Sequence, residues 1–164
     1  MDEHVVVSLL RLAAADVAQD AAWQRPSDER LVLLGLDALL AGVESPSLAQ
    51  LAGLGHREHH AARELFAQAL EELSLLPLAE DDLEDARWTA ARWWSREILA
   101  GNLDPLDGAT LIWLEAAAEL GYPQALQPIV TLAQAATANE DPPAGQQPLK
   151  TDIVSAASRF LRAV

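Results

Sequence analysis

The chain has 164 residues, is 51% hydrophobic, and carries a formal net charge of −14 from 25 acids and 11 bases. This length and composition are typical of one folded domain with a hydrophobic core, and they favour a folded chain over an intrinsically disordered one. Because the negative charge repels phosphate backbones and anionic lipids, we expect neither sequence-independent nucleic-acid binding nor a membrane partner.

Apolar residues recur at helical spacing along nearly the whole chain, which predicts an all-α fold. The first expected helix carries the apolar stripe from Val6 to Val17. Ser27 is a favoured N-cap residue and predicts a Leu-rich helix that ends near Gly42. Ser45-Pro46 fits the cap and first position of a short helix that ends at about Ala52.

The central part of the chain predicts two longer helices. An amphipathic helix is expected from His56 to about Leu75, with Pro77 closing it. The acidic run Glu80–Asp85 begins the next helix, where carboxylates complement the positive end of the helix dipole. That helix is expected to continue to Ala100.

A helical hairpin is expected at the centre of the fold. Asp104-Pro105 resembles a capping motif and predicts a helix over about 105–120. Gly101 and this cap imply a tight reversal, so the helices around 82–100 and 105–120 should pack antiparallel. Gly108 leaves room for a close approach of the two backbones.

The last part of the chain adds a helix that ends at about Ala138, followed by a linker-like stretch over 139–149. Thr151 predicts the cap of a final helix over 150–163. The whole sequence thus predicts about seven or eight helices in a compact single domain over residues 1–164, with no convincing strand.

The sequence carries no signal that directs it out of the cytoplasm. It contains no cysteine, which excludes disulfides, a thiol nucleophile and Cys-ligated metal. The start Met1-Asp2-Glu3-His4 lacks the basic character of a secretory signal, and no apolar run is long enough to span a bilayer. We therefore expect a cytoplasmic protein.

Three of the five tryptophans, Trp88, Trp93 and Trp94, fall within about two turns of one expected helix. A helix buries one broad side, so these three indoles cannot all face the same core. At the helical step of about 100° per residue, Trp94 falls on the apolar side and should meet Trp113 in the core. Trp93 falls about 150° from the middle of that side.

An exposed tryptophan beside arginines is typical of a binding hot spot. We therefore predict a partner-binding surface around the off-face indole, and the alternative is that this indole packs under a neighbouring helix. The predicted surface consists of Arg92, Trp93, Arg96 and Glu97.

A histidine-rich segment offers a weak metal motif. His56, His60 and Glu64 are spaced i, i+4, i+8, so on one helix face they could supply two nitrogens and an oxygen. The spacing differs from the His-Glu-x-x-His pattern of zinc proteases, and no fourth ligand is indicated. We interpret the segment as a solvated helix face and expect no cofactor.

The acidic run matches the Asp-Asp-x-x-Asp pattern with which terpenoid synthases and prenyltransferases hold magnesium. The matching carboxylates are Asp81, Asp82 and Asp85. Those enzymes are about twice as long and have a second metal motif, which this sequence lacks. We interpret these acids as complementing the helix dipole.

Residues 48–63 also fit a helix-turn-helix pattern, with Gly53-Leu54-Gly55 as the turn. The second helix would present a mixed set of bases and acids whose charges cancel, namely Arg57, Glu58, His59, His60, Arg63 and Glu64. A transcriptional regulator that reads DNA through this segment is therefore one alternative function.

From about Leu31 onward, over about four-fifths of its length, the chain resembles a group of small acidic helical proteins from actinobacteria. The resemblance implies an all-helical fold but no active-site residues, because no chemistry attaches to the shared motifs. These motifs are Leu34–Gly42, Ser45–Leu48, Leu51–Leu54, Arg92-Trp93-Trp94, Ile98, Gly101, Leu103-Asp104-Pro105, Gly108-Ala109, Ile112-Trp113, Leu120–Pro123, Asp152-Ile153 and Ala156-Ala157.

The sequence shows no nucleophile elbow, no phosphate-binding Gly-rich loop and no dinucleotide fingerprint. With the net charge of −14 and the off-face Trp93, this favours a non-enzymatic acidic protein-interaction module. Such a module would dock a basic protein partner, as immunity or antitoxin-type proteins do. A helix-turn-helix regulator and a metal-dependent enzyme are the alternatives, and the sequence does not indicate the oligomeric state.

Overall fold

The computed structural model describes residues 1–19, 25–55, 57–138 and 146–163. Over these residues the chain forms eight α-helices and no strand, which confirms the predicted all-α class. The chain folds as two compact units, Met1–Ala86 and Arg87–Val164. The sequence predicted a single domain over residues 1–164, and these two units are parts of that one chain.

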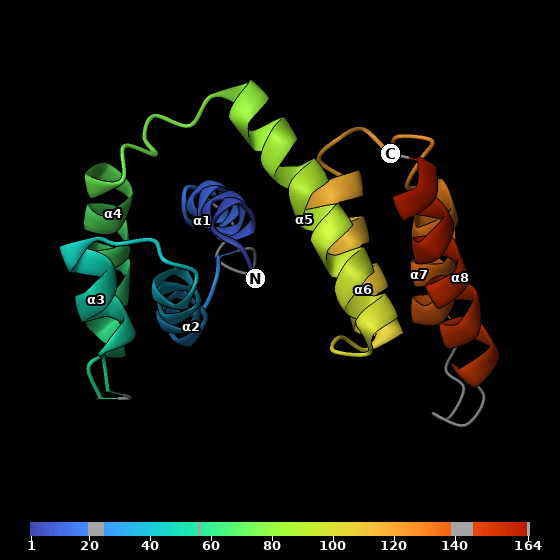
Figure 1. Cartoon of the computed structure of the whole chain (residues 1–164), viewed down its shortest axis with the longest axis horizontal. Helices are drawn as coiled ribbons and strands as arrows, with labels where there is room; N and C mark the ends of the chain where they lie inside the picture. Colours follow the sequence, from blue (N-terminus) through green and yellow to red (C-terminus); the bar gives the residue numbers. More distant parts are fainter. Residues whose placement is uncertain (20–24, 56, 139–145, 164) are drawn as a thin grey trace. The chain divides into compact units, whose positions relative to one another are not determined.

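The first unit is built from four helices and the start of a fifth. The short helix α3 packs against both α2 and α4, and Figure 1 shows these three helices grouped together in this unit. The four helices are α1 (Glu3–Val17), α2 (Asp28–Leu40), α3 (Pro46–Ala52) and α4 (Ala62–Glu72). The largest side chains of the shared core are Leu10, Leu31, Leu48, Leu51 and Phe66.

Serine caps begin two of these helices, as the sequence predicted. Ser27 Oγ accepts a hydrogen bond from Arg30 N at 3.2 Å and begins α2. Ser45 Oγ accepts from Leu48 N at 3.2 Å and begins α3, with Pro46 at its first position. Each cap satisfies a backbone N–H that the first helical turn leaves without a partner.

Helix α4 begins later than the sequence predicted. Residues 57 and 58 lie in a turn, and His59–Ala61 form a single 3₁₀ turn before α4 begins at Ala62. The residue before α4 is Ala61, which has no side chain able to cap a helix. The predicted amphipathic helix therefore exists, but it covers only residues 62–72 of the expected range 56–75.

The second unit is built from α5 and the helices that follow it. Figure 1 shows α7 and α8 side by side in this unit. Its elements are α5 (Glu80–Ala100, which enters this unit at Arg87), α6 (Pro105–Leu111), the π-helix η2 (Ile112–Ala117), α7 (Gln127–Ala138) and α8 (Gln147–Ala163).

The predicted antiparallel hairpin of α5 and α6 is confirmed. Gly101 ends α5 with φ at +77°, a conformation that glycine adopts without steric cost. Ile98 lies against Gly108 near this turn, and at the other end Arg87 pairs with Glu119 at 3.5 Å. The first contact joins the end of α5 to the start of the second stretch, and the second contact joins an earlier part of α5 to a later part of that stretch. The two stretches therefore run in opposite directions.

The second half of the hairpin contains a wide turn that the sequence did not predict. Residues Ile112–Ala117 form a π-helix, and Ala118 N donates to Trp113 O, five residues back, at 2.9 Å. Its inward face remains apolar, since Ile112, Ala116 and Ala117 are fully buried.

The start predicted for the last helix was wrong. Helix α8 begins at Gln147, ahead of both the predicted range 150–163 and the proposed cap Thr151. Thr151 lies inside the helix, where its hydroxyl donates to Gln147 O at 3.1 Å. Of the predicted linker over 139–149, residues 139–145 lie outside the described part of the chain.

Candidate functional site

The three neighbouring tryptophans of α5 have different environments, as the helix geometry predicted. Trp94 is 5% exposed and belongs to the core. Trp88 is partly buried and stacks on Phe160 of α8, with ring centroids 6.3 Å apart. Trp93 is partly buried, neither sealed in the core nor fully exposed. Its indole therefore retains some surface for a partner.

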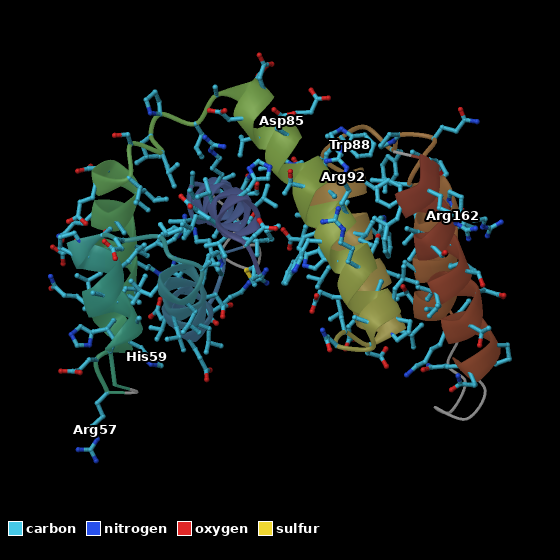
Figure 2. All side chains as sticks on the ribbon, in the orientation of Figure 1. Arg57, His59, Asp85, Trp88, Arg92 and Arg162 are labelled. Atoms are coloured by element: carbon cyan, nitrogen blue, oxygen red, sulfur yellow. The ribbon has the colours of Figure 1, made fainter. Side chains whose placement is uncertain are left out.

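The residues around Trp93 present both charges. Arg96 is exposed and Arg92, which Figure 2 shows on α5, is partly exposed. The Glu97 carboxylate accepts a hydrogen bond from Asn102 Nδ2 at 3.1 Å, which ties it to the end of α5. The partner surface of Arg92, Trp93, Arg96 and Glu97 stays a prediction that the fold permits.

The structure does not assemble the predicted histidine motif into a site. His60 and Glu64 are exposed, and His56 lies outside the described residues. Within the described residues, no group of three His, Asp or Glu side chains is placed to hold a metal ion. The interpretation of this segment as a solvated face that holds no cofactor stays a prediction.

The acids at the start of α5 occupy the positions that complement the helix dipole. Asp81 and Asp82 lie in its first turn, and Asp82 pairs with Arg11 of α1 at 3.6 Å. Asp85 is exposed one turn later. This arrangement accounts for the acidic run without a bound cation.

The segment predicted as helix-turn-helix differs from that motif in its second helix. Arg57 and His59 precede α4, which leaves Arg63 as the one base of the three within it. Arg63 Nη2 donates to Pro26 O at 3.0 Å. Its Nε lies 3.0 Å from Asp28 Oδ1, an ion pair whose angles fall outside those of a hydrogen bond. Arg63 thus helps to join α4 to the start of α2.

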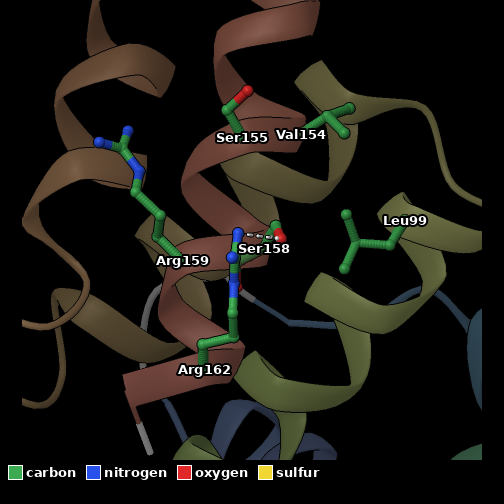
Figure 3. Close-up of a pocket in the computed structure, with 6 residues that line it drawn as sticks. All are labelled: Leu99, Val154, Ser155, Ser158, Arg159 and Arg162. Carbon is green, nitrogen blue, oxygen red and sulfur yellow. Dashed lines mark hydrogen bonds between the residues drawn. The ribbon is translucent and has the colours of Figure 1, made fainter.

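A hollow of about 580 Å³ lies between α5 and α8 in the second unit. Leu99 contributes from α5 and is 43% exposed, while the other lining residues come from the last turns of α8. These residues are Val154, Ser155, Ser158, Arg159 and Arg162. Figure 3 shows Leu99 on one side of the hollow and the two arginines on the other.

Arg162 is held in place by the preceding turn of α8. Its Nε donates to Ser158 O at 3.2 Å and its Nη2 to Ser158 Oγ at 2.9 Å. Figure 3 shows this side chain turned back along the helix toward Ser158. An arginine restrained in this way loses less conformational freedom on binding a ligand.

Sequence reasoning missed this hollow. Arg159 and Arg162 stand one helical turn apart, a spacing that is common on any solvated helix face. Leu99 is far from both along the chain, and only the packing of α5 beside α8 brings it to the same place. The one usable signal was the absence of acids after Asp152 in an otherwise acidic chain.

The charge is divided very unequally between the two units. Residues 1–86 hold 17 of the 25 acids and five of the 11 bases, a net −12. Residues 87–164 hold the other eight acids and six bases, a net −2. The electrostatic field predicted from the whole chain therefore arises almost entirely from the first unit.

Comparison with known proteins adds no functional information. No protein-family model, curated protein or solved structure matches the chain. The resemblance to actinobacterial helical proteins therefore stays a prediction. None of the helices in the described residues is long and apolar enough to cross a membrane.

Proposed function

We propose that the protein is an acidic interaction module that binds a basic protein partner. The observation that carries this proposal is the net charge of −12 on residues 1–86, where five bases cannot neutralise 17 acids. Such a surface accelerates the encounter with a cationic protein and disfavours acidic competitors. Binding of this kind is typical of immunity and antitoxin-type proteins, and it assigns no catalytic residue.

Charge attracts a partner, but a specific contact needs an anchor. Exposed Glu84 and Asp85 precede the predicted surface on the same helix, and Asp85, Arg92 and Arg96 share one stripe of it. Trp93 is the large side chain at this place, and partly buried indoles flanked by charged residues are frequent hot spots. We propose that the partner contacts Trp93 and that the negative charge of the protein accelerates its approach.

The test begins with affinity capture from the source cells, after which the captured protein is produced separately and its affinity is measured by calorimetry. We expect a basic partner whose binding weakens steeply as salt rises. Trp93→Ala should weaken it by about 30-fold, the scale of a hot-spot residue. Leu114→Ala, which removes a side chain that is 52% exposed in the same unit, is the matched control and should change little.

Three results would count against the proposal. They are an acidic or salt-insensitive partner, equal effects of the two variants, and no protein partner at all. Tight binding of duplex DNA at physiological salt would favour the helix-turn-helix alternative, and stoichiometric metal in the purified protein would favour the metal-enzyme alternative. The cytoplasmic location stays a prediction. Finding the partner in the cytoplasm would support it, and finding the partner in another compartment would contradict it.

A further inference from the structure

The hollow between α5 and α8 joins two cationic side chains to an apolar wall. Arg159 and Arg162 lie on one side, and Leu99 and Val154 form the apolar part. We infer that this hollow binds a small organic anion that has a carboxylate or phosphate head and an apolar tail. This inference does not depend on the basic partner proposed above.

The electrostatics of the hollow favour an anion. In the described residues neither Arg159 nor Arg162 has an acidic side chain within ion-pair distance, although the chain carries 25 acids. The sequence from Ile153 to Val164 contains no acid at all. Two like charges one helical turn apart repel each other. A bound anion would remove that repulsion.

Hydrogen-bond donors in the hollow remain available to a ligand. Two N–H groups of Arg162 are used by Ser158, which leaves Nη1 and the second hydrogen of Nη2. Ser158 Oγ accepts from Arg162, so its own hydrogen can be donated to an oxyanion. A planar guanidinium matches the two oxygens of a carboxylate or phosphate. The donor set therefore suits an oxyanion.

The size and the apolar wall imply more than an inorganic ion. The hollow has a volume of about 580 Å³ and opens widely to solvent. A bare phosphate would leave most of it filled with water against Leu99 and Val154. An aliphatic tail lying on these side chains would bury their exposed surface, including that of Leu99, which is 43% exposed.

A purely structural role explains only part of this arrangement. Arg162 lies in the last turn of α8, where a cation complements the negative end of the helix dipole. That effect falls off within the last turn, and Arg159 lies before it.

The experiment is a titration of the full-length ¹⁵N-labelled protein, followed by amide chemical shifts. The probes are octanoate, octyl phosphate, inorganic phosphate and octylammonium. We expect saturable shifts for the two tailed anions, centred on residues 154–162 and Leu99. Inorganic phosphate should bind at least about tenfold more weakly, because each buried methylene contributes about 0.8 kcal/mol. Octylammonium, which has the tail without the anion, should not saturate.

Variants separate the two parts of the site. Arg159→Gln and Arg162→Gln should each weaken octanoate about tenfold, the scale of a charged hydrogen bond that is partly exposed to water. Leu99→Ser should weaken octanoate but leave inorganic phosphate unchanged. Arg57→Gln is the matched control, since Arg57 is an exposed arginine that Figure 2 shows pointing away from its unit.

Several results would overturn the inference. They are the absence of saturation by either tailed anion, shifts centred outside the hollow, affinity unchanged in both arginine variants, and inorganic phosphate binding as tightly as octanoate. Because the substituted side chains lie at the surface, the spectrum of each variant also shows directly whether the fold is retained.

Discussion

Ile98 lies so close to Gly108 that a β-carbon added to the glycine would stand 2.6 Å from both Cδ1 and Cγ1 of Ile98. Ile98 is 3% exposed, so its side chain must change its rotamer inside the core to make room for the added carbon. We expect Gly108→Ala to lower the free energy of unfolding by about 1–3 kcal/mol, the cost of overpacking a core. Urea denaturation measures this change.

A second glycine provides the control for this substitution. At Gly53 an added β-carbon would be 3.4 Å from its nearest neighbour, Ala49 O, and the backbone conformation is one that alanine adopts readily. Gly53→Ala should therefore be neutral or slightly stabilising. Adding Ile98→Ala to Gly108→Ala should cost less than the two single changes together. Additive costs would show that the close approach is not the cause.

The stacked pair Trp88 and Phe160 joins α5 to α8 and should contribute a measurable coupling energy. We expect Phe160→Leu and Trp88→Leu each to destabilise the protein. Together they should destabilise it by about 0.5–1.5 kcal/mol less than the sum, since the aromatic contact is lost only once. A double-mutant cycle measured in urea tests this. Strict additivity would mean that the rings contribute only through burial.

Glu72 should make stability depend on acidic pH. Hydrogen bonds to its carboxylate from Ser45 Oγ, from Ser47 Oγ at 2.7 Å and from Ser47 N at 3.0 Å hold its pKa below the ordinary value. A pKa that is lower in the folded state adds stability above the unfolded value of 4.5. That stability is lost as pH falls through the folded pKa.

Denaturation midpoints between pH 7 and pH 3 test this prediction. We expect Glu72→Gln to be less stable than the parent protein at neutral pH, and the difference should shrink as the pH falls below 4.5. Glu71 is the exposed neighbour of Glu72 on α4. Glu71→Gln is the control and should change neither the stability at neutral pH nor its dependence on pH. A constant difference between Glu72→Gln and the parent would show that ionisation of Glu72 is not involved.

Asp104 both caps α6 and pairs with Lys150, and substitution can separate the two roles. Burial raises its pKa, but hydrogen bonds from Lys150 and from Leu106 N at 2.9 Å outweigh burial and lower it. We expect Asp104→Ala to cost about 1 kcal/mol through the lost cap. Asp104→Asn keeps an acceptor and should cost only a few tenths, the scale of a surface ion pair. Equal losses in thermal unfolding would assign the whole effect to charge.

The sequence was most informative where a short local rule decides the structure. Ser27, Ser45 and Asp104 each precede a helix, and the side-chain oxygen of each accepts a hydrogen bond from a backbone N–H of the first turn. Their capping role follows from residue type alone. Gly101 likewise ends α5 where the hydrophobic period stops. The antiparallel hairpin followed from these signals because its two helices are adjacent in the chain.

Local rules failed where two residues could each begin the same helix, and where the packing of helices against each other determines the structure. Thr151 is a good cap residue by type, yet α8 begins at Gln147, with Pro148 in its first turn where a missing N–H costs nothing. The π-helix has no distinctive sequence pattern. The division into two units depends on which helices pack together, and hydrophobic periodicity does not report that.

The candidate sites illustrate the same limit. The position of Trp93 away from the apolar side of its helix could be predicted from helix geometry, because it depends on one helix only. The hollow was not, because Leu99 and Arg159 belong to helices whose pairing no local pattern predicts. The uneven division of charge could be counted only once the boundary at Ala86 was known.

The wide turn at Ile112–Ala117 also bears on how this helix tolerates a change of length. A π turn holds about one residue more than an α turn, so it absorbs that residue while the helical residues on either side keep their register. Deleting one codon within this stretch should therefore restore the α pattern and leave the side chains before and after it facing as they do now. The same deletion in the regular part of α5 has no wide turn to absorb it and would rotate the following side chains by about 100°.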